Sequence, residues 1–262
     1  MDKNKLKVVI LGSGTSTGVP VISCSCSICK SEEQYNKRLR SSLLVIDQDQ
    51  GQNILIDTSP DMRQQLLQQK IDHLDHVLFT HTHADHLHGF DDLRAVCFRR
   101  EDPLTCWLEQ EHFDDIKKRF SYLFQTTGYS GTKASLKYHI IRSPSSFHLG
   151  PLEVEHISLP HGHTTSTAYR MGSFAYATDF KSFPEEYVRQ WQGKIQVMVA
   201  SGLHFETHHS HSSISETIEL FRALEVKKGI ITHLSHKIDY QKDSKKLPKN
   251  ISLAYDGMVL HI

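Results

Sequence analysis

Residues 81–86 read HTHADH and directly follow the apolar run HVLFT. His81 and His83 are two positions apart, so in extended backbone their side chains point the same way and could chelate one ion. Asp85 and His86 lie in the turn beyond and could address a second ion beside the first. Two divalent ions that share ligands suit hydrolysis, because together they activate water and stabilise the attacking and leaving oxygens. Four ligand-type residues in six positions argue against a loop of merely solvated histidines.

A cysteine cluster stands apart from this motif. Three of the five cysteines crowd into CSCSIC, at Cys24, Cys26 and Cys29. A structural zinc requires four nitrogen or sulfur ligands, so this loop lacks one. The other two cysteines stand in the apolar segments RAVCFRR and PLTCWLE and are interpreted as core residues. The candidate for the fourth ligand is His236 in THLSH. The alternative is a loop of three reduced buried thiols.

The elements that must position these residues follow from hydrophobic periodicity and turn signals. Strands are predicted at 6–11, 41–47, 53–57, 76–81, 105–109, 137–142, 152–159, 167–172, 173–179, 195–201 and 228–233. Helices are predicted over 60–69, 91–98, 111–124, 183–191 and 213–224, the first with Ser59 as N-cap and Pro60 at its first position, the last with Ser213 as N-cap. Residues 125–135 and 241–249 are predicted surface loops.

Two successive runs of strands, each with helices, predict an α/β (α+β) fold with two sheets packed face to face and helices outside them. This is an αββα four-layer sandwich. The 262 residues suit a single domain over 1–262 with a sizeable core. There is no linker, low-complexity segment or short-period repeat.

The HxHxDH pattern after a strand is the signature of the metallo-β-lactamase superfamily, whose fold is this sandwich, and the chain resembles that superfamily. The motifs LGSGTSTGVP, CSCSIC, DTSPDMRQQLL, HTHADHLHGFDDLR, LPHG, YATD, THLSH and AYDGM occur in this order. Together they resemble the PhnP-type branch, the family of the phosphoribosyl cyclic phosphodiesterase. The resemblance covers nearly the whole chain.

The resemblance completes a dinuclear site. It adds His161 in LPHGH, Asp179 in YATD and His233 in ITH to the HTHADH ligands, with Asp179 bridging the two ions. Asp85 and Asp179 thereby count among the catalytic residues. His163 is a rival to His161, because both stand in HGH. The spacing to the following strand favours His161.

The resemblance also places a proton donor in ETHHSHSS, residues 206–213. The matching position is His211, with His208 and His209 as nearby rivals. An imidazole with a pKa near neutrality suits a general acid. The structural alternative is a set of polar residues at a helix entry. The family's cysteine cluster pairs with the second histidine of THxSH, which is His236 here.

These observations predict a metal-dependent hydrolase, and more specifically a phosphodiesterase for a small cyclic or nucleotide-like phosphodiester, with two active-site ions (Mn or Zn, or else Fe) and one structural Zn. Alternatives are a nuclease resembling tRNA 3′-processing endonucleases and a non-enzymatic metal-binding module.

Lys+Arg and Asp+Glu are both 30, which argues against a nucleic-acid partner. No apolar run reaches the ~20 residues of a membrane span, so a cytoplasmic protein without a membrane partner is expected. The resemblance suggests a homodimer.

Overall fold

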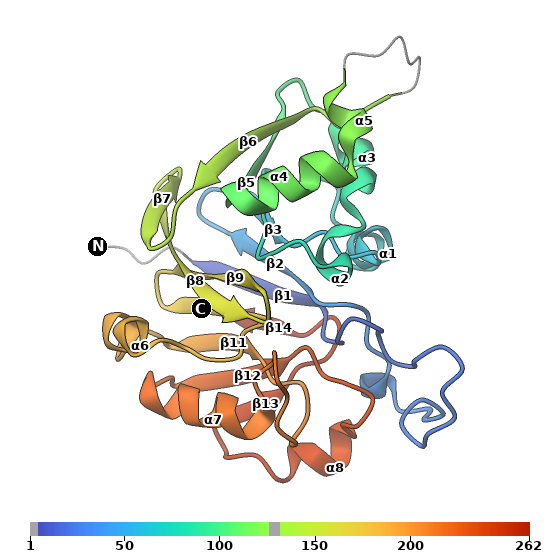
Figure 1. Ribbon diagram of the computed structural model, residues 1–262, viewed down its shortest axis with the longest axis vertical. Coiled ribbons are helices and arrows are strands. Elements are labelled where there is room, and N and C mark those ends of the chain that lie inside the picture. Colours follow the sequence, from blue (N-terminus) through green and yellow to red (C-terminus); the bar gives the residue numbers. More distant parts are fainter. Residues whose placement is uncertain (1–4, 126–131) are drawn as a thin grey trace.

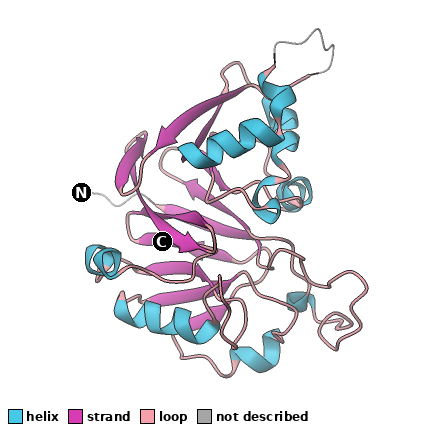
Figure 2. Ribbon diagram, viewed as in Figure 1, coloured by secondary structure: helices cyan, strands magenta, loops and turns pink. Residues whose placement is uncertain are grey.

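Two seven-stranded sheets face each other, with helices on their outer sides (Figure 1). The computed structural model describes residues 5–125 and 132–262. The first sheet has the order β14-β1-β2-β3-β4-β5-β6 and the second β13-β12-β11-β10-β9-β8-β7. Figure 2 shows the resulting alternation of helical and strand layers. The α/β sandwich predicted from the sequence is confirmed.

The bounds of the elements are as follows. The strands of the first sheet are β1 (Leu6–Gly12), β2 (Ser42–Asp47), β3 (Gln52–Ile56), β4 (His76–Leu78), β5 (Leu104–Glu109), β6 (Leu136–Ile141) and β14 (Val259–His261). Those of the second are β7 (Ser145–Leu149), β8 (Leu152–His161), β9 (Thr164–Met171), β10 (Phe174–Ala177), β11 (Val197–Ser201), β12 (Lys228–Thr232) and β13 (Ile251–Leu253). The α-helices are α1 (Met62–Gln68), α2 (Ala84–Leu87), α3 (Leu93–Cys97), α4 (Gln110–Arg119), α5 (Ser121–Phe124), α6 (Glu185–Trp191), α7 (Ile214–Ala223) and α8 (Tyr240–Ser244).

Strand β1 shows how one apolar run serves two layers. Leu6, Val8 and Ile10 belong to the core between the sheets, whereas Val9 and Leu11 belong to the core under the helices of the first half. Successive side chains of a strand point to opposite faces, so a strand in the middle of a four-layer fold is apolar on both. This explains the unbroken apolar run VVIL, residues 8–11 of the sequence.

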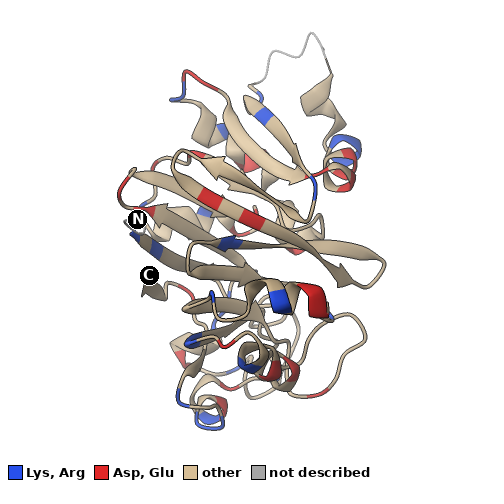
Figure 3. Ribbon diagram, turned by 90° about the vertical axis from the view of Figure 1, so that its left-hand side faces the viewer, with Lys and Arg blue, Asp and Glu red and all other residues tan. Residues whose placement is uncertain are grey.

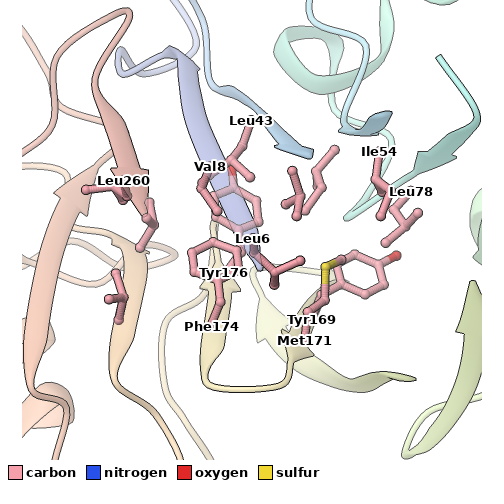
Figure 4. Close-up of a cluster of buried hydrophobic side chains, with 14 of the residues drawn as sticks. Leu6, Val8, Leu43, Ile54, Leu78, Tyr169, Met171, Phe174, Tyr176 and Leu260 are labelled. Carbon is pink, nitrogen blue, oxygen red and sulfur yellow. The ribbon is translucent and has the colours of Figure 1, made fainter. Parts of the chain in front are cut away.

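The inter-sheet core fixes how the two halves face each other. Tyr169 and Met171 of β9 and Phe174 and Tyr176 of β10 point toward the aliphatic side chains of the first sheet (Figure 4). The buried Tyr169 hydroxyl also donates to the carbonyl of Phe79 at 2.6 Å. This hydrogen bond ties the second sheet to the segment that leads into HTHADH.

The parallel strands of both sheets direct the site. Strands β3, β4 and β5 are parallel in the first sheet, and β10, β11 and β12 are parallel in the second. In open α/β sheets, ligand sites form beyond the carboxyl ends of such strands. Asp57 follows β3, His81 follows β4, Asp179 follows β10 and His233 follows β12. The predicted chemistry therefore converges on one edge of the sandwich.

Of the two predicted helix N-caps, one is wrong and one is confirmed. The helix expected from Pro60 begins at Met62, and its N-cap is Asp61, not Ser59. The Ser59 hydroxyl accepts from the Asp61 amide and donates to Gln65 Oε1 at 2.9 Å, so it shapes the turn before the helix. The Ser213 cap is confirmed, with a capping box to Glu216.

Other differences concern segments with weak periodicity. The helix predicted over 111–124 is broken at Phe120, whose φ of −109° and ψ of 39° are not helical. Part of the predicted loop 241–249 belongs to α8, which Asp239 caps by accepting from the Lys242 amide. The loop predicted at 125–135 includes residues 126–131, which lie outside the described part of the chain. Strands β7, β13 and β14 were not predicted, and β14 returns to pair with β1.

Candidate active site

The HTHADH segment spans the end of an extended stretch and the short helix α2 (Ala84–Leu87). The rings of His81 and His83 lie 4.6 Å apart between centroids, and those of His81 and His86 lie 4.4 Å apart. His81, Asp85 and His86 are buried, while His83 is exposed. The extended backbone followed by a helical turn thus gathers all four side chains.

Two groups of potential ligands form around this segment. In the first, one donor atom each of His81, His83 and His161 lies within 4.8 Å of the others. In the second, Asp85, His86 and His233 meet the same condition. Residues from the two halves of the chain therefore complete each other's groups.

Asp179 lies between the two groups. Its Oδ2 is 2.8 Å from His86 Nε2, and its Oδ1 is 3.3 Å from His233 Nε2. It also forms ligand-type groups with His81 and His86 and with His161 and His211. A carboxylate with two oxygens facing different imidazoles can bridge two cations.

Three of these strand ends share an unusual backbone. Asp57, Asp179 and His233 have φ values of 64°, 51° and 59°. Side chains other than glycine in this left-handed region cost on the order of 1–3 kcal/mol each, and such residues cluster at functional sites. The turn at each strand end directs its side chain into the site instead of along the sheet.

Asp57 is a residue of the site that the sequence analysis missed. Its fully buried carboxylate accepts from the Thr80 amide at 2.8 Å and the Thr80 hydroxyl at 2.7 Å. Its Oδ2 is also 2.7 Å from His86 Nδ1, which fixes the ring with Nε2 toward Asp179. Carboxylates that orient a ligand imidazole in this way tune metal sites. The sequence signal was an aspartate directly after a buried strand.

The chemistry of the donor atoms fits divalent cations. Within the described residues, His81 Nε2 is buried and has no hydrogen-bond partner, although buried polar atoms are normally satisfied. Burial, followed by the neighbouring His86, holds the pKa of His81 well below its usual value. Burial likewise lowers the pKa of His161 to about 4. Both imidazoles are therefore neutral at physiological pH, as metal ligands must be.

The carboxylates are ionised for a different reason. Burial alone would raise the pKa of Asp179, but His233, His86 and a hydrogen bond with His211 bring it well below its usual value. Burial opposes ionisation of Asp85 too, and His86 and His233 lower its pKa. Around His86 the balance is reversed: despite burial, Asp85, Asp179 and Asp57 raise its pKa. Cations bound there would take the place of the His86 proton.

The predicted proton donor, His211, contacts Asp179. His211 Nδ1 is 2.9 Å from Asp179 Oδ1, and the side chain is 17% exposed. A cavity of about 300 Å³ opens beside it, and its walls include His83, His161, His163 and His209. The rival His208 does not line this cavity, and its Nδ1 accepts from the Ser210 amide at 3.3 Å. His209 lines the cavity but is exposed.

The two histidines of HGH are separated by the turn between β8 and β9. His161 Nε2 is 3.1 Å from His83 Nδ1, and its Nδ1 is 3.1 Å from the Ser210 carbonyl. His163 is exposed and faces the cavity. The geometry therefore supports His161 as the ligand.

We expect His161→Ala to lower the affinity for active-site metal by at least about tenfold, because it removes a donor atom from the first group. His163→Ala is the matched control and should keep its metal. Metal content after dialysis, measured by atomic emission, checks both variants. Retention of metal by His161→Ala together with its loss from His163→Ala would reverse the assignment.

A second cluster lies outside this site. One donor atom each of Cys24, Cys26, Cys29 and His236 lies within 4.8 Å of the others, and His236 Nδ1 is 3.3 Å, 3.7 Å and 3.6 Å from the three sulfurs in that order. Three sulfurs and one nitrogen match a closed tetrahedral zinc site. A hydrogen bond from the Cys29 backbone lowers the pKa of Cys26 to about 6, whereas burial raises that of Cys29 to about 11.

The remaining cysteines are core residues, as predicted. Cys97 and Cys106 pack in the core between the first sheet and its helices. Burial raises the pKa of both thiols. Neither takes part in the cluster around His236.

Comparison with known proteins places this geometry in a family. Residues 52–234 match the model of the beta-lactamase superfamily domain. The chain belongs to the metallo-β-lactamase superfamily. Within the superfamily it is PhnP-like: it superposes on the crystal structure of a diphosphatase from the PhnP family with a TM-score of 0.91 and 31% identity, covering 98% of this chain and 97% of that one.

Other similar proteins differ from this chain in length or identity. An octanoyltransferase from Porphyromonas gingivalis is 38% identical over 255 residues, 97% of this chain, but the chain spans only 51% of that protein. A coenzyme PQQ synthesis protein B from Methylobacterium radiotolerans is 36% identical over 101 residues, 34% of each protein. The Zn²⁺-bound PqqB structure from Methylobacterium extorquens shares the fold, with a TM-score of 0.79 and 20% identity over 98% of this chain and all of that one. The superfamily implies divalent metal ions, and this neighbour contains zinc.

The described part of the chain contains no helix that is both long enough and apolar enough to cross a lipid bilayer.

Proposed function

We propose that the protein is a dinuclear metal-dependent phosphodiesterase that cleaves a small cyclic or nucleotide-like phosphodiester. The observation that carries this proposal is the position of Asp179 between the two ligand groups, in contact with His86, His233 and His211. Two divalent ions, Mn or Zn or else Fe, would be held by His81, His83, Asp85, His86, His161, Asp179 and His233. When bound, such ions supply Lewis-acid activation of water and stabilise charge on phosphoryl oxygens.

The chain's own residues then perform three tasks. His211 stands at the cavity wall and can give a proton to the departing oxygen of the ester. Asp179 holds the His211 ring through Nδ1, which leaves Nε2 for the substrate side. Asp57 and Thr80 fix His86 from behind. The proton donor, the metal ligands and the residues that orient those ligands thus come from separate elements that meet at one edge of the sandwich.

The cavity supports a small substrate. Its volume of about 300 Å³ is at the lower limit of ordinary ligand pockets. The net charge is zero, and Lys/Arg and Asp/Glu are interspersed over the view in Figure 3. A nuclease for tRNA gains affinity from many cationic contacts with phosphates, so we rank that alternative below a small-molecule phosphodiesterase. A homodimer remains part of the proposal through the resemblance alone.

The similarity to an octanoyltransferase does not by itself indicate acyl transfer by this chain, because that protein is about twice as long as the match. Covalent acyl transfer through a cysteine thiol requires that thiol beside the bound acyl group. All five cysteines of this chain lie in the zinc-type cluster or in the core of the first half. We therefore propose that the transfer named in the relative belongs to the half outside the match.

A substrate panel tests the proposed reaction. Purified protein loaded with Mn²⁺ should hydrolyse bis(p-nitrophenyl) phosphate and small cyclic phosphodiesters, and it should leave an octanoyl thioester and a precursor tRNA uncleaved. Cleavage of the thioester or of the tRNA with no phosphodiesterase activity would replace the proposal by the corresponding alternative. Inactivity toward every substrate with every metal would favour a binding module.

We also propose that Cys24, Cys26, Cys29 and His236 hold a structural zinc. His236 follows His233 by three residues, and Leu234 between them contacts the segment GSGTSTG, residues 12–18: its amide donates to the Ser13 carbonyl at 2.8 Å. Because this short segment joins both sites, loss of the zinc should displace His233 as well.

We expect His236→Ala to lose one chelation-resistant zinc and roughly 2–5 kcal/mol of stability, in line with the loss of a structural cross-link or metal. Phosphodiesterase activity should fall with it, since His233 loses its support. Zinc content, thermal unfolding and turnover are the readouts, and the exposed His261→Ala serves as control. A variant that keeps its zinc and its melting temperature would reject the pairing.

A further inference from the structure

A buried arginine lies beside the segment that carries His236. Arg38 is only 2% exposed, although arginine is rarely buried completely. Burial lowers its pKa to about 10, while Asp256, Asp239 and Asp243 raise it. The guanidinium is therefore still charged at neutral pH. A buried charge is unfavourable unless its surroundings compensate for it, so its partners indicate its role.

The guanidinium holds the chain on both sides of His236. Its Nη1 donates to the Ser235 carbonyl at 3.2 Å, one residue before His236. Its Nη2 donates to the Ile238 carbonyl at 2.9 Å, two residues after it. The planar fork of arginine can hold two carbonyls at once, which the single ammonium of lysine does not reproduce. His236 is thereby fixed between two points.

The same residue is connected to the cysteine loop. The Arg38 amide donates to the Val19 carbonyl at 2.7 Å, and the Val19 amide donates to the Arg38 carbonyl at 2.8 Å, just before that loop begins. Nη2 also donates to Asn36 Oδ1 at 3.0 Å, and Asn36 Nδ2 donates to Ser31 Oγ at 3.2 Å, just after the loop ends. Arg38 therefore joins both ends of the loop to the His236 segment.

The positive charge of Arg38 also complements the charge expected of a zinc-loaded site. The three acceptors of the guanidinium are uncharged: two carbonyls and an amide oxygen. A zinc ion with three thiolates and a neutral imidazole carries one net negative charge. The Arg38 guanidinium, which is itself buried next to the ligand segment, carries the opposite charge and offsets part of this negative charge.

We propose that Arg38 is the positioning residue of the Cys24/Cys26/Cys29/His236 site. It holds His236 in register with the cysteine loop and compensates the charge of the loaded site. This inference rests on the proposed structural zinc. Partners that orient a ligand commonly change metal affinity by about 10–100-fold.

The test uses the full-length protein loaded with zinc or with cobalt. Arg38→Met removes the charge and the fork but retains an apolar stem, and Arg38→Lys retains the charge alone. Zinc release to a chromogenic chelator should be about 10–100-fold faster in Arg38→Met and intermediate in Arg38→Lys. The thiolate-to-cobalt charge-transfer band of the cobalt-loaded protein should shift or weaken in the same order.

Arg170→Met is the matched control, because Arg170 is also largely buried, pairs with Glu155 and lies on β9. It should lower thermal stability without changing zinc release. Wild-type zinc release and an unchanged cobalt spectrum in Arg38→Lys would overturn the inference, even if Arg38→Met fails to fold. Wild-type protein without a slowly released zinc would overturn the zinc site itself, and phosphodiesterase activity would then be judged separately.

Discussion

We expect Asp179→Asn to abolish nearly all of the proposed phosphodiesterase activity, with a decrease in kcat of roughly a thousandfold or more. The substitution removes the negative charge that faces His86, His233 and His211 together. Two cations would lose the ligand between them, and the proton donor would lose its anchor. Turnover of bis(p-nitrophenyl) phosphate and active-site metal content should fall together.

The control for this variant is Asp47→Asn. Asp47 is equally buried but lies at the end of β2, where it accepts from the amides of Asp49 and Gln50. We expect it to lower stability and to leave metal content and activity unchanged. Activity that survives in Asp179→Asn, at unchanged metal content, would remove Asp179 from the bridging position.

His211→Asn separates acid catalysis from metal binding. We expect kcat to fall by about 10²–10⁴-fold for a phosphodiester with an alkoxide leaving group, because that oxygen requires a proton. For a p-nitrophenolate leaving group, which departs readily without a proton, the decrease should be much smaller. Metal content should be unchanged, since both ligand groups remain complete without His211.

Two neighbouring variants provide the comparison. His209→Asn removes an exposed imidazole of the same cavity, and His208→Asn removes one that accepts from the Ser210 amide. Neither should show the dependence on leaving group. A dependence that appears in His209→Asn but not in His211→Asn would move the proton donor to His209.

The sequence predicted the fold through strong local signals. The apolar runs of β1, β2, β11 and β12 are buried on both faces, so their strand character follows from composition alone. The N-cap of α7 was recognisable from Ser213, and the structure adds Glu216 as its capping-box partner. Strand β14 was not, because its three residues gain their place only by pairing with β1 at the other end of the chain. Pairing over such a separation leaves no local pattern.

In the candidate site, too, some residues could be predicted from local sequence and others only from the tertiary fold. The HTHADH segment could be interpreted from spacing, whereas His161, Asp179 and His233 rested on resemblance until the strand ends brought them together. Asp57 was missed, because its role depends on a left-handed turn after β3 and on a ring that arrives from α2. The sequence does not display a backbone angle imposed by the tertiary fold. Arg38 was missed for a related reason, since nothing near it in sequence indicates complete burial.

The most direct test of the account is to count active-site metal against turnover. Chelator-treated protein, which is metal-free at the active site but keeps its chelation-resistant zinc, is titrated with Mn²⁺ while bound metal and hydrolysis of bis(p-nitrophenyl) phosphate are measured in the same samples. The account predicts that activity appears with the metal and saturates when two ions are bound per chain, beyond the chelation-resistant zinc. Full turnover by the metal-free protein, or no turnover at any occupancy, would contradict it.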